Sequence, residues 1–387
     1  MHALYSPGFT LRTLLVICAL CVVSLLYIPI SIIDDLAAIY GTSERLAAGV
    51  ITFFSFSYAI GFLIFGPLSD RLGRVKVISW GLVALSAITL LLNLTDSIFV
   101  LLAGRALQGL IAATFTPVAI AYLSERGTPQ QRSWSVAWIS TAFLSAGLLG
   151  QIYGETVVRT LGMSRGAVPL VCVYLLTALG LSLTPADTPQ TVSLSLAERF
   201  RSAGQVLRNP WLQRIYFIAF ILLMCFVSFY MTLNFHAVKI LAGFGVTAFT
   251  VSVFSLPAFL MTLLAPYLLK IFNPEKVIAA GLVLSIAGTL ASILGLSAGF
   301  YSLIIGSLLF VAGISIIVPG LIASIAAETD IEYRGLAVSF YTFVLFLGAS
   351  LGPLLAQSTR NLSAPLSLSV QAIIMFVAFV YLTLNKK

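Results

Sequence analysis

Long, uninterrupted apolar runs separated by short polar segments are the dominant pattern of this chain. A helical crossing of a bilayer core needs about 20 mostly apolar residues, which these runs supply. Strands of a membrane barrel would instead alternate polar and apolar positions over about 10 residues. The runs lie at residues 12–33, 46–68, 77–94, 98–123, 135–154, 167–184, 214–236, 247–269, 277–296, 300–326, 336–357 and 366–384. The pattern therefore predicts an all-α integral membrane protein with twelve transmembrane helices.

Composition excludes a soluble domain. Hydrophobic residues make up 60% of the chain and charged residues only 9%, whereas a soluble domain carries about 25% charged residues. A net charge of +8 could indicate a nucleic-acid partner, but the basic residues gather in the short loops. We therefore expect lipid, and no nucleic acid, around this chain. The first apolar run lacks a cleavage pattern and is long enough to span, so we expect it to remain as a helix.

The basic residues also predict the orientation. With both ends in the cytoplasm, fifteen of the 21 Lys and Arg residues lie in inside segments and five in outside segments, and Arg105 lies within a span. Cytoplasmic loops carry such an excess of positive charge. We expect both termini in the cytoplasm, and the short loops favour a bacterial inner membrane.

The two halves of the chain repeat with an offset of 202 residues. Matching pairs are Arg12 with Arg214, Gly104 with Gly306, Pro117 with Pro319, Arg132 with Arg334, and Gly150 with Gly352. The repeat predicts two pseudo-symmetric six-helix bundles, 1–184 and 214–387. Between them, 185–213 is expected to be a cytoplasmic linker with a short amphipathic helix, in which Leu196, Phe200, Ala203 and Leu207 share one face. Such repeats occur in transporters whose substrate binds near the middle of the membrane.

Two motifs carry a resemblance to a known family. The loop "GPLSDRLGRVK", residues 66–76, resembles the G-x-L-x-D-R-x-G-R-[KR] motif of the major facilitator superfamily, with Val75 at the last basic position. The stretch "RALQGLIAA", residues 105–113, resembles the R-x-x-Q-G-x-x-A-A motif of its drug:proton antiporters. The resemblance implies a major facilitator fold and proton-coupled efflux of small amphipathic compounds, drugs or metabolites, by alternating access. A proton symporter or facilitator that imports a small organic solute is the alternative.

In that family the loop motif latches the outward-facing state. The resemblance implies that Arg74 pairs with Asp70 and Glu125, and that Asp70 faces the start of the eleventh span near Arg334. The full set expected in this latch is Gly66, Asp70, Arg71, Gly73, Arg74, Glu125 and Arg334. Gly66 and Gly73 would permit tight turns or close backbone approach. We expect Asp70→Asn to prevent transport without preventing membrane insertion.

Ionisable residues at membrane depth are costly and indicate function. Arg105 lies about two turns into the fourth span and needs an anionic or carbonyl partner. Titratable groups at the same outer level are Asp34, Asp35, Glu155 and His236, of which His236 is the offset counterpart of Asp34. They are either a proton relay, with a carboxylate near Arg105, or residues of the wet interface.

Polar and aromatic residues within spans are candidates for a substrate cavity. They are Tyr27, Tyr58, Gln108, Gln151, Tyr230, Asn234, Tyr341 and Gln357. Aromatic walls with few fixed charges suit an amphipathic substrate. The fifth span departs from the antiporter pattern G-x8-G-x3-G-P-x2-G-G, because only Gly150 and Gly154 keep their glycines and Gln151 replaces the proline.

Enzymatic chemistry is not expected, since the sequence offers no nucleophile–base arrangement, metal cluster or phosphate loop. No metal or cofactor is expected. The four cysteines lie in apolar runs and are expected to be packing thiols. A membrane scaffold or sensor is a further alternative, and it would not need Arg105 or Asp70. We expect a monomer whose partners are a small-molecule substrate, protons and lipid.

Overall fold

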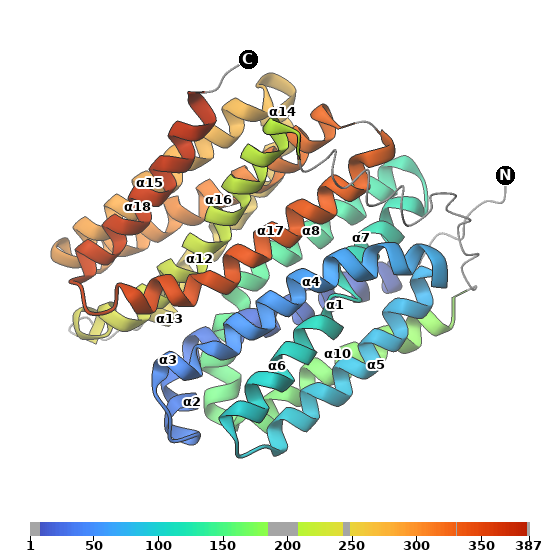
Figure 1. Ribbon diagram of the computed structural model, residues 1–387, viewed down its shortest axis with the longest axis horizontal. Coiled ribbons are helices and arrows are strands. Elements are labelled where there is room, and N and C mark those ends of the chain that lie inside the picture. The colour runs from blue at the N-terminus through green and yellow to red at the C-terminus, as the bar shows by residue number, and fades with distance from the viewer. Residues whose placement is uncertain (1–7, 185–207, 243–247, 330, 385–387) are drawn as a thin grey trace. The chain divides into compact units, whose positions relative to one another are not determined.

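A computed structural model of the chain describes residues 8–184, 208–242, 248–329 and 331–384. Within these ranges every regular element is a helix (Figure 1). The chain divides into two compact units, 1–193 and 194–387. The division falls inside the connection expected at 185–213, but the amphipathic helix predicted there lies outside the described residues.

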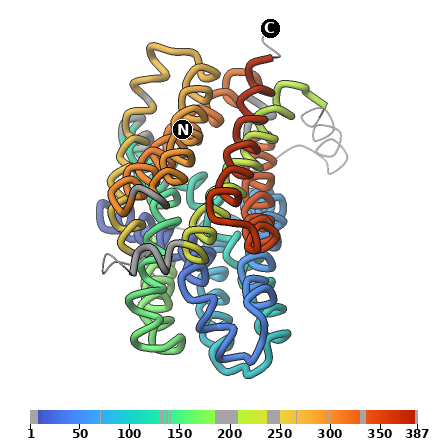
Figure 2. Tube along the Cα trace, turned by 90° about the vertical axis from the view of Figure 1, so that its left-hand side faces the viewer, coloured from blue at the N-terminus to red at the C-terminus, as the bar shows by residue number. Residues whose placement is uncertain are grey.

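The helices of each unit pack side by side as a bundle (Figures 1 and 2). The N-terminal unit contains α1 (Phe9–Tyr27), η1 (Ile28–Ile32), α2 (Ile33–Ile39), α3 (Glu44–Ala47), α4 (Gly49–Leu72), α5 (Arg74–Leu91), η2 (Leu92–Leu94), α6 (Ile98–Ala112), α7 (Thr116–Glu125), α8 (Pro129–Tyr153), η3 (Gly154–Val158), α9 (Arg159–Leu161) and α10 (Met163–Ser182). The C-terminal unit contains α12 (Pro210–Ala242), α13 (Ala248–Ser255), η4 (Leu256–Leu264), α14 (Ala265–Ile271), α15 (Pro274–Ala298), α16 (Phe300–Glu328), α17 (Ile331–Ser358) and α18 (Ala364–Thr383).

Eleven helical segments of the described residues are long and apolar enough to cross a membrane. They coincide with eleven of the expected spans. The remaining one, 135–154, coincides with α8, whose 25 residues give a length of about 37 Å. The prediction of an all-α membrane protein is confirmed.

One of the two glycines of the charged loop makes its turn. Gly73 has φ +93° and separates α4 from α5. That backbone conformation strains any residue with a Cβ atom, which explains a glycine there. Gly66 instead lies within α4. Two roles were expected for Gly66, a tight turn or a close backbone approach, and the expectation of a turn is wrong.

Glycines set the same close helix packing in both units. A Cβ atom on Gly150 of α8 would lie 2.9 Å from the carbonyl oxygen of Ser24 in α1. A Cβ atom on Gly352 of α17 would lie 2.6 Å from the Cβ atom of Val227 in α12. Gly150 and Gly352 are offset partners, so each unit packs its fifth span against its first through an equivalent small residue.

Two breaks in regular helix face one another in the N-terminal unit. The 3₁₀ segment η1 follows α1 and contains Pro29, which has no N–H group to donate. The π-helical segment η3 follows α8, and η1 packs against η3. A Cβ atom on Gly154 would lie 2.5 Å from the Ile28 carbonyl oxygen, so the glycine permits this contact. Irregular backbone at membrane depth is tolerated where it is buried or lines a cavity, and π-turns are common at functional sites.

Candidate functional site

Arg105 is a buried cation in the N-terminal unit. It lies about two turns from the start of α6, and its exposed fraction is 7%. Its Nε donates to the carbonyl oxygen of Val50 (3.1 Å), Nη2 to that of Leu25 (2.7 Å), and Nη1 to Oε1 of Gln108 (2.6 Å). Of the two kinds of partner expected for Arg105, an anion or a carbonyl group, the structure provides carbonyl oxygens. These bonds tie α6 to α1 and α4.

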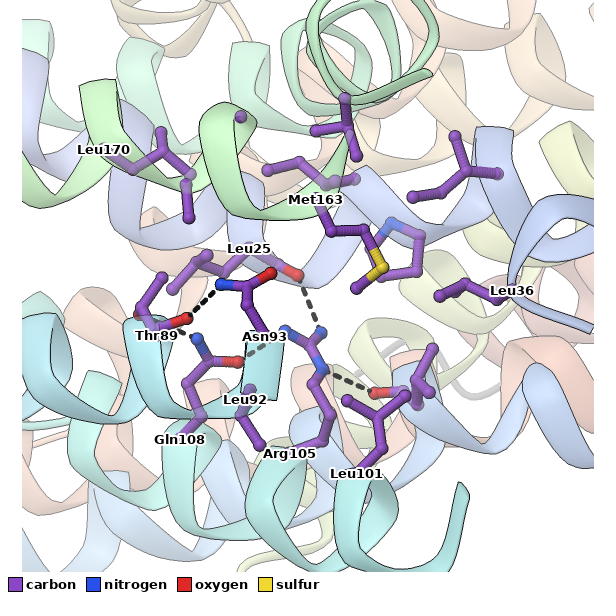
Figure 3. Close-up of a pocket in the computed structure, with 17 residues that line it drawn as sticks. Leu25, Leu36, Thr89, Leu92, Asn93, Leu101, Arg105, Gln108, Met163 and Leu170 are labelled. Atoms are coloured by element: carbon purple, nitrogen blue, oxygen red, sulfur yellow. Dashed lines mark hydrogen bonds between the residues drawn. The ribbon is translucent and has the colours of Figure 1, made fainter. Parts of the chain in front are cut away.

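A polar network continues from Arg105 toward the end of α5. Gln108 donates from Nε2 to Oγ1 of Thr89 at 2.8 Å, and Asn93 donates from Nδ2 to the Thr89 carbonyl oxygen at 2.8 Å (Figure 3). The ring of Phe54 lies 4.4 Å from Arg105 Cζ, so one face of the guanidinium rests on an aromatic ring. The network holds the cation in one orientation by neutral groups.

A cavity of about 90 Å³ opens above this network within the N-terminal unit. Its polar side is formed by Arg105, Gln108, Thr89 and Asn93, and Met163 reaches into it from α10 (Figure 3). The remaining lining is apolar apart from Gly166 and consists of Leu25, Ile28, Pro29, Ile32, Leu36, Val50, Leu92, Leu101, Val158, Ala167 and Leu170. The cavity can hold several water molecules beside the buried charge.

Two of the carboxylates expected in the proton relay, Asp35 and Glu155, meet a different arginine. Arg159 donates from Nε to Asp35 Oδ2 at 2.8 Å and from Nη1 to Glu155 Oε1 at 2.6 Å. Among the described residues no carboxylate pairs with Arg105, so the expected carboxylate neighbour is not found there. Burial opposes the charge of Arg159, but the hydrogen bonds and charges of Asp35 and Glu155 outweigh it and raise the pKa of the guanidinium.

Arg159 was missed by the sequence reasoning. Its position four residues after Glu155 is the one signal that could have found it, because such pairs meet on a helix surface. The two other relay candidates lie elsewhere. Asp34 is exposed in the first turn of α2. His236 is half-buried in α12, and its Nε2 has no hydrogen-bond partner among the described residues.

Arg74 of the charged loop forms the expected ion pair with Glu125. Arg74 is the first residue of α5, and Glu125 is the last residue of α7. Arg74 donates from Nε to Oε2 of Glu125 at 2.8 Å and from Nη2 to Oε1 of Glu125 at 2.5 Å. Two parallel bonds fix the orientation of the pair as well as its distance. Arg71 is exposed at the end of α4. The side chains of Asp70 and Arg334 lie outside the described part of the molecule.

The aromatic and amide candidates of the N-terminal unit are buried. Tyr27 is buried in α1, and the Tyr58 hydroxyl is hydrogen-bonded to the Thr116 hydroxyl. Gln151 donates to the carbonyl oxygen of Gly147 at 2.7 Å. Of the predicted cavity residues in this unit, only Gln108 lines the cavity above Arg105.

The C-terminal unit has hydroxyl groups where the N-terminal unit has its cation. Ser307 is the offset counterpart of Arg105, and it bonds the hydroxyls of Tyr230 (2.9 Å) and Ser255 (2.7 Å). Sequence reasoning found Tyr230 but missed both serines, because serine is common in membrane helices and carries no distinguishing pattern. The two units therefore differ in charge at this equivalent position.

Other polar side chains of the C-terminal unit are buried or half-buried. The Tyr341 hydroxyl and Gln357 Nε2 have no hydrogen-bond partner among the described residues. Asn234 is half-buried in α12. Gln371 of α18, which the sequence reasoning did not single out, donates to Ser228 and Thr232 at 3.0 Å each. These groups give the unit hydrogen-bonding capacity without charge.

Comparison with known proteins identifies the class. The sequence profile of the Major Facilitator Superfamily matches residues 14–251 and 235–387. The chain belongs to this superfamily and is a membrane transporter. Its similarity to the human organic anion transporter MFSD10 covers 97% of this chain and 98% of that one, with a TM-score of 0.68 at 19% identity. The outward conformation of FucP gives a TM-score of 0.66 at 17% identity, over 95% and 98% of the two chains. These two similarities show the fold.

The relatives in sequence include bacterial transport proteins. The inner membrane transport protein YajR of Escherichia coli is 27% identical over 46% of this chain and 39% of its own length. The multidrug resistance protein MdtG of Citrobacter koseri is 25% identical over 66% of this chain and 64% of its own length. The chloramphenicol resistance protein CraA of Acinetobacter baumannii is 30% identical over 37% and 34%. The chain thus aligns with less than two thirds of the length of each of these relatives.

Proposed function

We propose that the chain is a proton-coupled exporter of small amphipathic compounds that works by alternating access. It would lie in the inner membrane of a bacterium as a monomer with both termini in the cytoplasm. The names of MdtG and CraA, a multidrug and a chloramphenicol resistance protein, support export. The positive-inside pattern of the loops supports the orientation.

The observation that carries the proposal is the buried Arg105–Gln108 network. A charge inside a membrane helix is costly and is kept where it serves a function. The two residues occupy the ends of the R-x-x-Q motif, and three elements supply the acceptors that hold the guanidinium. A membrane scaffold would have no use for such a group. Arg105 would serve as the fixed positive charge of the coupling machinery.

We assign proton exchange to the outer carboxylates, first of all to Asp35 and Glu155. Both pair with Arg159 and both are partly open to solvent, so a proton from the outside can reach them and compete with the arginine. Asp34 and His236 are further proton carriers in the proposal. Release of Arg159 on protonation of Asp35 would loosen the link between α2 and α9.

The Arg74–Glu125 pair supports the assignment of the loop motif as a conformational latch. In the proposal Gly66, Asp70, Arg71, Gly73 and Arg334 complete that latch. The substrate would be held by the polar and aromatic residues of the spans, namely Tyr27, Tyr58, Gln108, Gln151, Tyr230, Asn234, Tyr341 and Gln357. The hydroxyl cluster at Ser307 extends this set.

Transport in proteoliposomes tests the proposal. Vesicles containing the purified chain are loaded with a fluorescent amphipathic cation such as ethidium, and the outside is then acidified. Export by exchange with protons predicts faster loss of dye on acidification, and a much smaller effect in Arg105→Gln. If acidification instead drives uptake of an external solute, the chain is a symporter. Equal fluxes with and without the pH gradient would contradict proton coupling.

A further inference from the structure

The buried guanidinium of Arg105 has capacity for another ligand. A guanidinium carries five N–H groups. Arg105 uses three of them in hydrogen bonds to Val50, Leu25 and Gln108. Two N–H groups are left without an acceptor in the part of the chain that the structure describes. None of the three acceptors carries a charge, and a buried cation without an anion is unfavourable. The site therefore lacks a negative charge and retains donors to bind one.

The cavity beside Arg105 limits the size of that ligand. Pockets for drug-sized compounds have volumes of about 300–1,000 Å³, and this cavity has about 90 Å³. It lies wholly within the N-terminal unit, between α1, α4, α5, α6 and α10 and the segments that join them. An exported amphipathic compound is too large for it. Only a small molecule of a few heavy atoms fits.

The lining of the cavity is divided into a polar and an apolar side. Arg105 and Gln108 form the polar side with Thr89 and Asn93, and side chains such as Leu36, Met163 and Leu170 form the other (Figure 3). An inorganic anion would satisfy the cation but leave the apolar side in contact with water. A short alkyl carboxylate satisfies both, because its oxygens match the guanidinium and its chain covers the apolar wall.

The wall of the cavity is made in part by the two breaks in regular helix. Ile28, Pro29 and Ile32 of η1 and Val158 of η3 line it. Backbone that departs from α-helix at membrane depth typically surrounds a ligand or ion site. This second observation is independent of the charge of Arg105, and it points to the same cavity.

We propose that this cavity binds a short-chain monocarboxylate, with the carboxylate on Arg105 and the alkyl chain toward Met163 and Leu170. The site shares Gln108 with the residues proposed to hold an exported compound, but its existence does not depend on the direction of transport or on proton coupling. The ligand would compensate the buried charge and fill the space between η1 and η3.

Thermal unfolding of the full chain in detergent tests this site. The midpoint is followed by tryptophan fluorescence while formate, acetate, propionate, butyrate or chloride is titrated against sodium gluconate at constant ionic strength. Propionate and butyrate are expected to raise the midpoint by about 2–4 °C in a saturable manner, and formate and chloride by less. No anion-dependent shift, or an equal shift with chloride and butyrate, would overturn the proposal.

Three variants locate the effect. Arg105→Gln removes the cation and should abolish the shift, whereas Arg45→Gln, the same change at an exposed position of α3, should retain it. Ala167→Leu fills the cavity without touching the charge, and it should abolish the response to butyrate before that to formate. If Arg105→Gln does not fold, the responses of Ala167→Leu to butyrate and formate decide whether the anion binds in this cavity. Unchanged carboxylate responses in Ala167→Leu, or in a folded Arg105→Gln, would place the anion elsewhere and overturn the site.

Discussion

At the scale of single residues, the planar guanidinium of Arg105 matters most, because its N–H groups point in several directions and reach separate acceptors. Its three bonds leave in one plane toward acceptors on α1, α4 and α6 itself. Lysine keeps the charge but presents one ammonium group that cannot reach three separated acceptors in that plane. We expect Arg105→Lys to lose at least about 1.4 kcal/mol of transition-state stabilisation, a tenfold loss of transport. Initial rates of dye export measure this, with Arg45→Gln as the control, and a Lys variant with full activity would show that charge alone suffices.

Gln108 should contribute to stability through the bond that it accepts from Arg105. In Gln108→Leu the Nη1 group loses that acceptor, and Thr89 loses the hydrogen bond that it accepts. A buried donor left unpaired costs about 1–3 kcal/mol. We expect a lower midpoint of thermal unfolding in detergent. An unchanged midpoint would mean that water replaces the amide.

Arg159 gives a prediction about pH. The pKa of Arg159 is raised by Asp35 and Glu155, despite the opposing effect of burial. A raised pKa in the folded state means that the stabilisation is fully present below the ordinary pKa of arginine and is lost only above it. The destabilisation caused by Arg159→Gln should therefore not decrease as the pH rises from 6 to 9. A destabilisation that disappears by pH 9 would show that Arg159 loses its proton within that range.

At the scale of elements, the contact between η1 and η3 depends on Gly154. A Cβ atom there would lie 2.5 Å from the Ile28 carbonyl oxygen and from the Ser31 hydroxyl oxygen. Backbone cannot move aside easily, so Gly154→Ala should separate the two segments. We expect lower stability and reduced transport.

Gly180→Ala of α10 is the matched control for this prediction. Its Cβ atom would meet only the side-chain ends of Leu11 and Leu14, at 3.3 and 3.5 Å. It should retain the stability and transport of the parent chain. Equal behaviour of Gly154→Ala and Gly180→Ala, in thermal unfolding and in dye export, would show that the η1–η3 contact is not critical.

The same elements show what the sequence could and could not predict. The spans and the buried cation followed from apolar runs and from a charge inside one of them, which are local properties. The pairing of Arg159 with Asp35 did not, because 124 residues separate them and no local pattern links the two positions. The π-turn η3 has no sequence pattern of its own. Gly66 and Gly73 are equally capable of a turn, and helix packing decides that only Gly73 makes one.

At the scale of the whole molecule, the two units share packing but not charge. The first unit places Arg105 where the second places Ser307, and the first has the Arg74–Glu125 pair at the ends of α5 and α7. In the proposed mechanism this difference places the coupling cation and the Arg74–Glu125 part of the latch in the N-terminal unit. We expect Glu125→Gln to reduce transport several-fold, and the exchange Arg74→Glu with Glu125→Arg to restore part of it. Failure of the exchange alongside full activity of Glu125→Gln would remove the latch from the mechanism.

Movement of protons in response to substrate is the remaining question at this scale. Proteoliposomes without an imposed gradient, containing a trapped pH-sensitive dye, receive an amphipathic cation such as ethidium from outside. Exchange of substrate for protons predicts that the interior becomes more alkaline as the compound enters, and that Arg105→Gln removes the signal. An interior that becomes more acidic, or does not change pH while the compound crosses, would contradict proton-coupled export.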